Sequence, residues 1–157
     1  MQFIDLACIA VLAALVAGGT ARAQTDTPAP NAAASTAPAT SMLSVTFTGI
    51  EAKRGNIMLA LYDEASWSSG KPVRSEILDA ATGTASVVIS GLPVGRYGIK
   101  AFHDINGNSR MDSNPFGMPT EPFAFSNNAK GSMGPAAWED AAFAVGAGEA
   151  AQTITIR

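Results

Sequence analysis

Short runs in which apolar and polar residues alternate recur along the chain, and turn residues separate them. This period of two is typical of strands with one buried face. In one run both alternating sets, Ile57-Leu59-Leu61 and Met58-Ala60-Tyr62, are fairly apolar, which predicts a central strand. The pattern predicts strands at 43–47, 57–61, 85–89, 97–101, 123–125, 143–145 and 154–156.

About seven short strands without a convincing amphipathic helix predict an all-β fold, an immunoglobulin-like antiparallel β-sandwich. A small closed barrel is the alternative. Residues 63–79 give the weakest signal, because one helical turn at Asp63–Trp67 is followed by the breaking sequence Ser68-Ser69-Gly70-Lys71-Pro72. The connection after the fourth predicted strand, from about Asp104 to Trp138, is long, and long ordered loops are usually functional or anchored.

The N-terminal part predicts a secreted chain. Residues 1–23 resemble a signal peptide, with a short apolar run and Ala21-Arg22-Ala23 before the expected cleavage. Residues 24–41 are rich in Ala, Pro and Thr and predict a disordered linker, so the β-sandwich domain is expected at 42–157. We therefore expect a periplasmic or secreted protein of the bacterial envelope whose mature chain has no integral membrane span.

Composition excludes several function classes. The only cysteine, Cys8, lies in the predicted signal, so the mature chain has neither a disulfide nor a catalytic thiol. A formal net charge of -3 with few Lys and Arg leaves no electrostatic footprint for nucleic acid.

The run from His103 to Asp112 is the most informative segment. Its oxygen-bearing side chains occupy positions 1, 3, 5 and 9 of a calcium loop, and alternate residues of a tight loop can converge on one hard cation. Ser109 at position 6 and Pro115 at position 12 exclude an EF-hand. The alternative is an ion-free turn in which these side chains bond to their own backbone. The candidate ligands for calcium are Asp104, Asn106, Asn108, the Arg110 carbonyl, Asp112 and a returning Glu121.

Two longer motifs carry a family resemblance. They are Gly91-Leu92-Pro93-Val94-Gly95-Arg96-Tyr97-Gly98-Ile99 with Phe102-His103-Asp104-x-Asn106-x-Asn108, and Gly117-Met118-Pro119-x-Glu121-Pro122-Phe123-Ala124-Phe125-Ser126-Asn127-Asn128. Together they resemble the bacterial secreted domain of unknown function family 2141, over about residues 43–157. The turn into the strand is also similar to prealbumin-like and collagen-adhesin B-type sandwiches. The latter resemblance implies calcium in the Asp104–Asp112 loop, although Ser109-Arg110 replaces the more usual Gly-Lys. Prealbumin-like dioxygenases bind iron with two Tyr and two His. This chain has one His, so it does not have the residues for that iron site.

Several other residues have competing interpretations. His103 is either an acid–base group or, more simply, a strand-end histidine bonded to a neighbour. Ser126-Asn127-Asn128 is interpreted as a turn with left-handed backbone. The aromatics are expected to pack in the core or under loops, with a carbohydrate-stacking surface from Trp67 and Trp138 as the alternative. The packed aromatics are expected to be Phe116, Phe123, Phe125, Trp138 and Phe143.

The sequence therefore favours a non-enzymatic binding or structural module that carries calcium and meets an unknown envelope protein or polysaccharide. One alternative is a hydrolase using carboxylates near the loop. Another is a periplasmic copper-binding protein using His103 with Met111, Met118 and Met133, since thioethers suit Cu(I).

Overall fold

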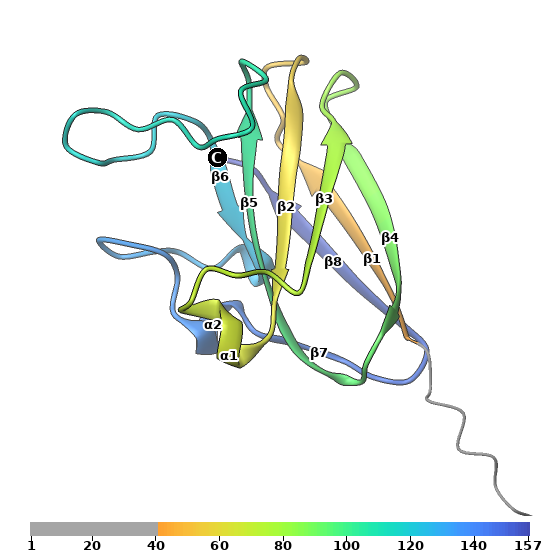
Figure 1. The fold of residues 1–157 in the computed structure, drawn as a ribbon. Helices are drawn as coiled ribbons and strands as arrows, with labels where there is room; N and C mark the ends of the chain where they lie inside the picture. The colour runs from red at the N-terminus through yellow and green to blue at the C-terminus, as the bar shows by residue number, and fades with distance from the viewer. Residues whose placement is uncertain (1–40) are drawn as a thin grey trace, which may run out of the picture. The chain divides into compact units, whose positions relative to one another are not determined.

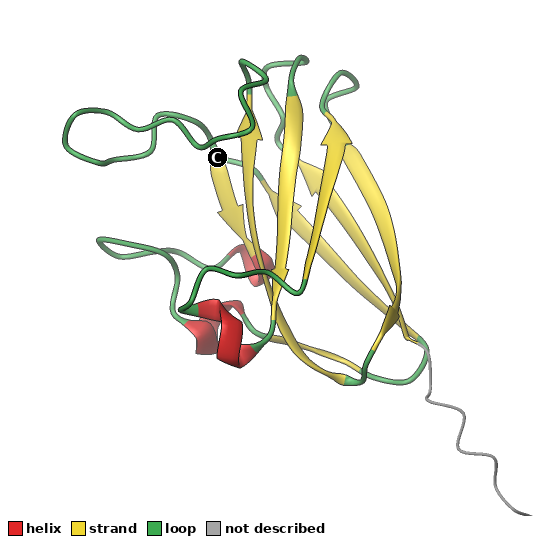
Figure 2. Cartoon of the chain, viewed as in Figure 1, coloured by secondary structure: helices red, strands yellow, loops and turns green. Residues whose placement is uncertain are grey.

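The computed structural model describes residues 41–157, and within them eight strands form two facing sheets (Figures 1 and 2). Helical structure within residues 41–157 is limited to single turns. The strands are β1 (Ser41–Thr48), β2 (Asn56–Tyr62), β3 (Arg74–Asp79), β4 (Ala85–Leu92), β5 (Gly95–Asp104), β6 (Phe123–Phe125), β7 (Phe143–Val145) and β8 (Glu149–Thr155). The short helices are α1 (Glu64–Trp67), the 3-10 turn η1 (Ser126–Asn128) and α2 (Trp138–Ala141).

The first sheet has the order β4-β1-β8, with β1 at its centre. Strand β1 pairs antiparallel with β4, where Val45 stands opposite Val87, and parallel with β8, where Val45 stands opposite Gln152. Because β8 is the last strand, this parallel pair joins the two ends of the described chain in one sheet.

The second sheet has the order β3-β2-β5-β6, and all its pairs are antiparallel. The long strand β5 changes partners along its length. Its first part, Gly95–Tyr97, pairs with β7, and the part from Gly98 onward pairs with β2. The loop that follows β5 therefore starts at the far end of the sandwich from β7.

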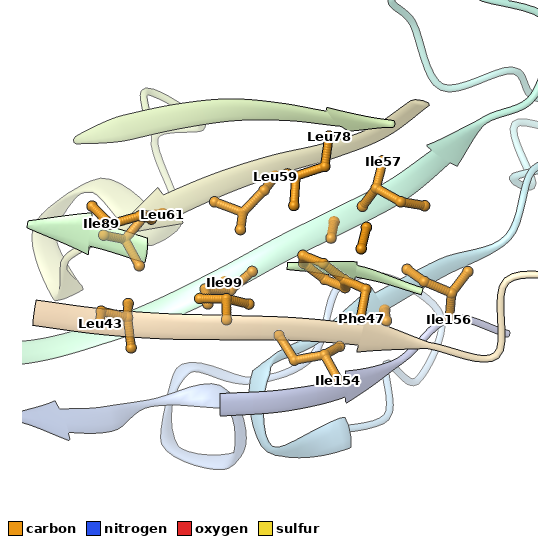
Figure 3. Close-up of a cluster of buried hydrophobic side chains, with 14 of the residues drawn as sticks. Leu43, Phe47, Ile57, Leu59, Leu61, Leu78, Ile89, Ile99, Ile154 and Ile156 are labelled. Carbon is orange, nitrogen blue, oxygen red and sulfur yellow. The ribbon is translucent and has the colours of Figure 1, made fainter. Parts of the chain in front are cut away.

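The core lies between the two sheets, and its largest contributions are the alternating inward-facing residues of β1, β2 and β5. Leu43, Val45 and Phe47 of β1 are fully buried, and Ile57, Leu59 and Leu61 of β2 face them (Figure 3). Each fully buried side chain of this size contributes about 1.5–3 kcal/mol of transfer free energy. The chain has one cysteine and forms no internal disulfide, so this core is the expected source of its stability.

The predicted β-sandwich is confirmed, but three details of the prediction were wrong. The pairing is not wholly antiparallel, because β1 and β8 are parallel. Arg74–Asp79 forms an additional strand, so the described residues contain eight strands rather than seven. The long loop region consequently follows the fifth strand rather than the fourth. The predicted helical turn at 63–67 is confirmed as α1, with Asp63 as its N-cap in a capping box with Ser66. The predicted signal and linker lie outside the described residues, except for Ser41, where β1 begins.

Candidate ion loop and outer-face groove

Asp104 ends β5 and organises the loop that follows it. Its side chain is buried, and both carboxylate oxygens accept backbone hydrogen bonds. Oδ1 accepts from the N–H groups of Gly107 (2.7 Å) and Asn108 (3.1 Å), and Oδ2 accepts from Ser109 (2.7 Å). Ser109 has a φ of 61°, in the left-handed region. Calcium loops usually have glycine at the position that Ser109 occupies. The backbone of Ser109 has the conformation that glycine adopts most easily.

The remaining predicted ligands form a second tier of hydrogen bonds. Asn106 Oδ1 accepts from the Asn108 N–H (3.0 Å), and Asn108 Oδ1 accepts from the Arg110 N–H (2.8 Å). The two amide nitrogens then donate to Asp112, at 2.6 Å to Oδ2 and 3.0 Å to Oδ1. In this conformation the loop satisfies its own polar groups, and an ion would require both amides to turn their oxygens toward Asp112.

Glu121 returns to the loop, as the sequence suggested. Its carboxylate is buried and links the two ends of the loop. Oε1 accepts from the Ile105 N–H (2.9 Å), and Oε2 accepts from the Asp112 N–H (3.1 Å). Between the described residues, each hydrogen bond to Asp104, Asp112 and Glu121 comes from a backbone N–H or an asparagine amide. Within residues 41–157, no three His, Cys, Asp or Glu side chains are grouped so as to hold a metal ion.

His103 lies on the inner side of the second sheet and is buried. Its Nε2 donates to the Arg54 carbonyl at 2.8 Å, because a carbonyl oxygen only accepts. The interpretation of His103 as a strand-end histidine bonded to a neighbour is therefore confirmed. Met111 and Met133 line a groove on the opposite, outer side of the sheet. The fold thus does not bring the histidine together with these methionines.

The outer face of the second sheet carries an apolar row that crosses all four strands. The register places Met58 opposite both Ile77 and Phe102, and Phe102 opposite Phe123. These four side chains share one face because side chains on a strand alternate. Ile77 is 63% exposed and Phe123 is 37% exposed. A sheet face that meets water normally carries polar residues at such positions, so the row indicates a covered or ligand-facing surface.

This row forms the floor of a groove of about 720 Å³. Its walls are two loops, at residues 105–122 and 129–137, which both project beyond β6 (Figure 1). The first loop contributes Met111, Gly117 and Pro119, and the second contributes Met133 and Pro135. The volume lies within the range of about 300–1,000 Å³ that is typical of small-molecule sites.

Among the described residues of the groove floor, Lys100 is the cation, and it lies in the register row beside the apolar one. It stands opposite Ala60 and Phe125. Its Nζ donates to the Trp67 carbonyl at 2.7 Å and lies 4.6 Å and 4.3 Å from the ring centroids of Tyr62 and Trp67. Burial lowers the pKa of this ammonium group below its usual value. The side chain is therefore held in place by a hydrogen bond and two cation–π contacts.

The aromatic residues beyond Lys100 form a second, smaller core. Trp67 packs 5.6 Å from Trp138 and 5.8 Å from Tyr62, measured between ring centroids. Both tryptophans are buried, so the alternative of a carbohydrate-stacking surface built from them is wrong. The expectation that Phe116 packs under a loop is also wrong, because Phe116 is 87% exposed at the tip of the first loop.

The Ser126-Asn127-Asn128 turn ties the two sheets together. Asn127 and Asn128 have positive φ, which confirms the prediction of left-handed backbone. Asn128 Oδ1 accepts from the Thr155 N–H of β8 at 2.8 Å. The buried Ser126 hydroxyl accepts from the Ile99 N–H and donates to the Ala141 carbonyl. This turn is structural, and it fixes where β6 ends beside the groove.

The comparison with protein families covers most of the described chain. The model of a family described as an uncharacterized protein conserved in bacteria, DUF2141, matches residues 45–154. The chain belongs to this family. No curated protein and no solved structure gave a match. In this DUF2141 domain the matched region includes the whole Asp104–Glu121 loop and the groove floor. No helix within residues 41–157 is long and apolar enough to cross a membrane.

The groove of the DUF2141 domain was missed by the sequence analysis, although one signal for it was present. Met58, Ala60 and Tyr62 were recognised as an apolar second face of β2, but this was interpreted only as evidence for a central strand. Strand β3 was not predicted from the sequence, so the cross-strand pairing of Ile77 with Met58 could not be foreseen. The two loops that form the walls flank β6 and η1 in the sequence, and only the fold brings them beside Met58 of β2 and Ile77 of β3.

Proposed function

We propose that this DUF2141 domain is a non-catalytic binding module of the bacterial envelope that takes a small apolar molecule into the outer-face groove. The observation that carries the proposal is the apolar row of Ile77, Met58, Phe102 and Phe123 beneath a groove of about 720 Å³. A row of this kind exposed to water is unfavourable, and a ligand that covers it gains about 25 cal/mol per Å² of apolar surface removed from water.

The chemistry of the lining favours binding over hydrolysis. Paired-carboxylate hydrolysis needs two acidic groups around the substrate. Among the described residues that line the groove, Glu76 is the one that carries a carboxylate. Placement in the envelope rests on the signal-like N-terminal segment of the sequence.

A fluorescence titration tests the groove. The neutral probe N-phenyl-1-naphthylamine is titrated into the purified protein, and its emission rises when it enters an apolar site. We expect Phe102→Ser to weaken binding about tenfold, since one aromatic side chain contributes roughly 1.5–3 kcal/mol when buried. Val88→Ser is the matched control, because Val88 is 60% exposed on β4 of the other sheet. Equal loss of binding in both variants would contradict the proposal.

A calcium ion in the Asp104 loop is a second candidate role, and it is compatible with the first. The observation that favours it is the convergence of the Asn106 and Asn108 amides on the Asp112 carboxylate. Rotation of the two amides would replace two N–H donors by two oxygens around that carboxylate, which is the mixed ligand set that calcium accepts. The three backbone hydrogen bonds to Asp104 do not involve the amide side chains, so this rotation would leave them in place.

Thermal unfolding after chelation, with and without added calcium, tests this role. We expect Tm to rise with calcium concentration, because an ion that binds only the folded state stabilises it. Asp112→Asn should abolish the rise while changing the calcium-free Tm little, because Asp112 is at the exposed side of the loop. Exposed Asp140→Asn on α2 is the control. An unchanged Tm in the unmodified protein would leave the loop as a self-satisfied turn.

A further inference from the structure

Lys100 adds a positive charge to one side of an otherwise apolar groove floor. It lies two residues before Phe102 on the same face of β5, which places the two positions about 7 Å apart along the strand. Phe102 belongs to the apolar row, and Lys100 belongs to the next row. The floor thus has an apolar band beside a fixed positive charge.

The ammonium group of Lys100 retains hydrogen-bonding capacity. It has three N–H donors, and between the described residues its one hydrogen bond is to the Trp67 carbonyl. Burial lowers the pKa of this group, and within residues 41–157 no carboxylate charge offsets that effect. Glu76 is the other charged residue of the lining, but it stands opposite Leu59, whose side chain is in the core. Because side chains on a strand alternate between faces, the Glu76 side chain lies on the opposite face of the sheet from Lys100.

We propose that the groove binds an amphipathic anion, with its apolar body on the Met58 and Phe102 row and its carboxylate on Lys100. This inference rests on the proposed function of the groove. The row crosses four strands, so its length is about 14 Å at a strand spacing of about 4.8 Å. A medium-chain carboxylate has a matching shape. Its head accepts the remaining N–H groups of Lys100 in a charge-assisted hydrogen bond, which is about twice as strong as a neutral one.

Displacement of N-phenyl-1-naphthylamine from the purified protein tests the inference. The competitors are decanoate, decan-1-ol and decyltrimethylammonium, which present an anionic, a neutral and a cationic head on the same chain. We expect decanoate to bind about tenfold more tightly than decan-1-ol, and the cation to bind most weakly. Lys100→Met should remove the preference for decanoate, so that decanoate and decan-1-ol bind the variant with similar affinity.

Three further variants serve as controls. Lys100→Gln removes the charge but keeps a donor for the Trp67 carbonyl, so it tests the charge if Lys100→Met fails to fold. Lys100→Arg keeps the charge and should keep a preference for the anion. Lys53→Met removes an exposed lysine that does not line the groove, and it should change nothing.

The outcomes separate this inference from the proposed function. Equal affinity for decanoate and decan-1-ol, unaffected by Lys100→Met, would overturn the anion preference while the groove remains a ligand site. Displacement by none of the three amphiphiles would also overturn it. If binding of the fluorescent probe itself does not depend on Phe102, the groove is not the binding site, and the proposed function fails as well.

Discussion

Ser109 donates its backbone N–H to Asp104 Oδ2 at 2.7 Å while its φ is 61°. The turn that gives the buried Asp104 carboxylate its third hydrogen bond therefore places an L-residue in a region where glycine is favoured. The loop keeps this conformation because the carboxylate is otherwise a buried charge with too few partners.

Replacing Ser109 by glycine should stabilise the domain. A left-handed conformation costs an ordinary residue about 1–2 kcal/mol, and the greater chain entropy of glycine offsets part of that gain. We expect a net increase of about 0.5–1 kcal/mol in the free energy of unfolding, measured by urea denaturation. Ser109→Ala is the control, because alanine keeps the strain and should give no gain. Equal shifts in the two variants would show that the side chain, rather than φ, matters.

Glu121→Gln should destabilise the domain, because both oxygens of the buried carboxylate accept backbone hydrogen bonds. Glutamine keeps one acceptor and turns an NH₂ donor toward the other N–H, which leaves a buried donor unsatisfied. We expect a loss of about 1–3 kcal/mol in urea denaturation. Amide exchange at Ile105 and Asp112 should accelerate together. Glu139→Gln, at an exposed position of α2, should leave both measurements unchanged, and equal losses in the two variants would contradict the role of Glu121.

Gly98→Ala should disturb the two tryptophans. A Cβ at Gly98 would lie 2.8 Å from the Trp67 ring and 3.0 Å from the Trp138 ring, closer than van der Waals contact allows. Overpacking of this kind costs about 1–3 kcal/mol. We expect lower stability and a shift in tryptophan emission, because the chain contains only these two tryptophans. Gly146→Ala is the matched control, since a Cβ there meets nothing within 4 Å, and an unshifted emission in Gly98→Ala would contradict the packing.

The two tyrosines should make the domain labile to alkali. Burial raises the pKa of Tyr62, and burial together with the nearby Asp63 charge raises the pKa of Tyr97, both from an ordinary value of 10.0. The folded state then keeps a phenol proton that the unfolded state loses, so stability falls as pH rises above about 10 and through the folded pKa. Lys100 acts in the opposite sense, because its lowered pKa makes stability rise with pH up to about 10.5.

A difference measurement isolates one tyrosine. Urea denaturation of the unmodified protein and of Tyr97→Phe is compared between pH 8 and pH 11. The variant loses the hydrogen bond from the Tyr97 hydroxyl to the Pro93 carbonyl at every pH, but it should lose less stability on going to high pH. Parallel pH curves for the two proteins would show that Tyr97 ionises equally in the folded and unfolded states.

The sequence predicted the parts of this fold that depend on local pattern. Alternation located seven of the eight described strands, including the short Phe123–Phe125 strand. Strand β3 was missed because its residues, Arg74–Asp79, contain one buried side chain, Leu78, and show no clear alternation. Its place at an edge of the sheet is set by pairing with β2, which is a tertiary relationship.

The loop residues were predicted more completely than the groove. Asp104, Asn106, Asn108 and Asp112 are close in sequence, and their hydrogen bonds span eight residues or fewer, so spacing alone brought them together. Glu121 was identified as a returning residue, and its carboxylate does meet the loop. Spacing does not reveal which atoms of the Asn106 and Asn108 amides face Asp112. In the structure their oxygens accept from backbone N–H groups, so their nitrogens donate to the Asp112 carboxylate.

By itself the sequence determined an all-β domain, a central β2 and an acidic loop whose oxygen-bearing side chains lie close together, because periodicity and turn chemistry act over a few residues. Only the tertiary structure decided that Met58 and Phe102 form one row with Ile77 and Phe123, and that Lys100 lies beside it. Register between strands depends on the packing of whole sheets, and one residue of slip would turn this row into the core. The surface that we propose as the ligand site is therefore a product of the fold.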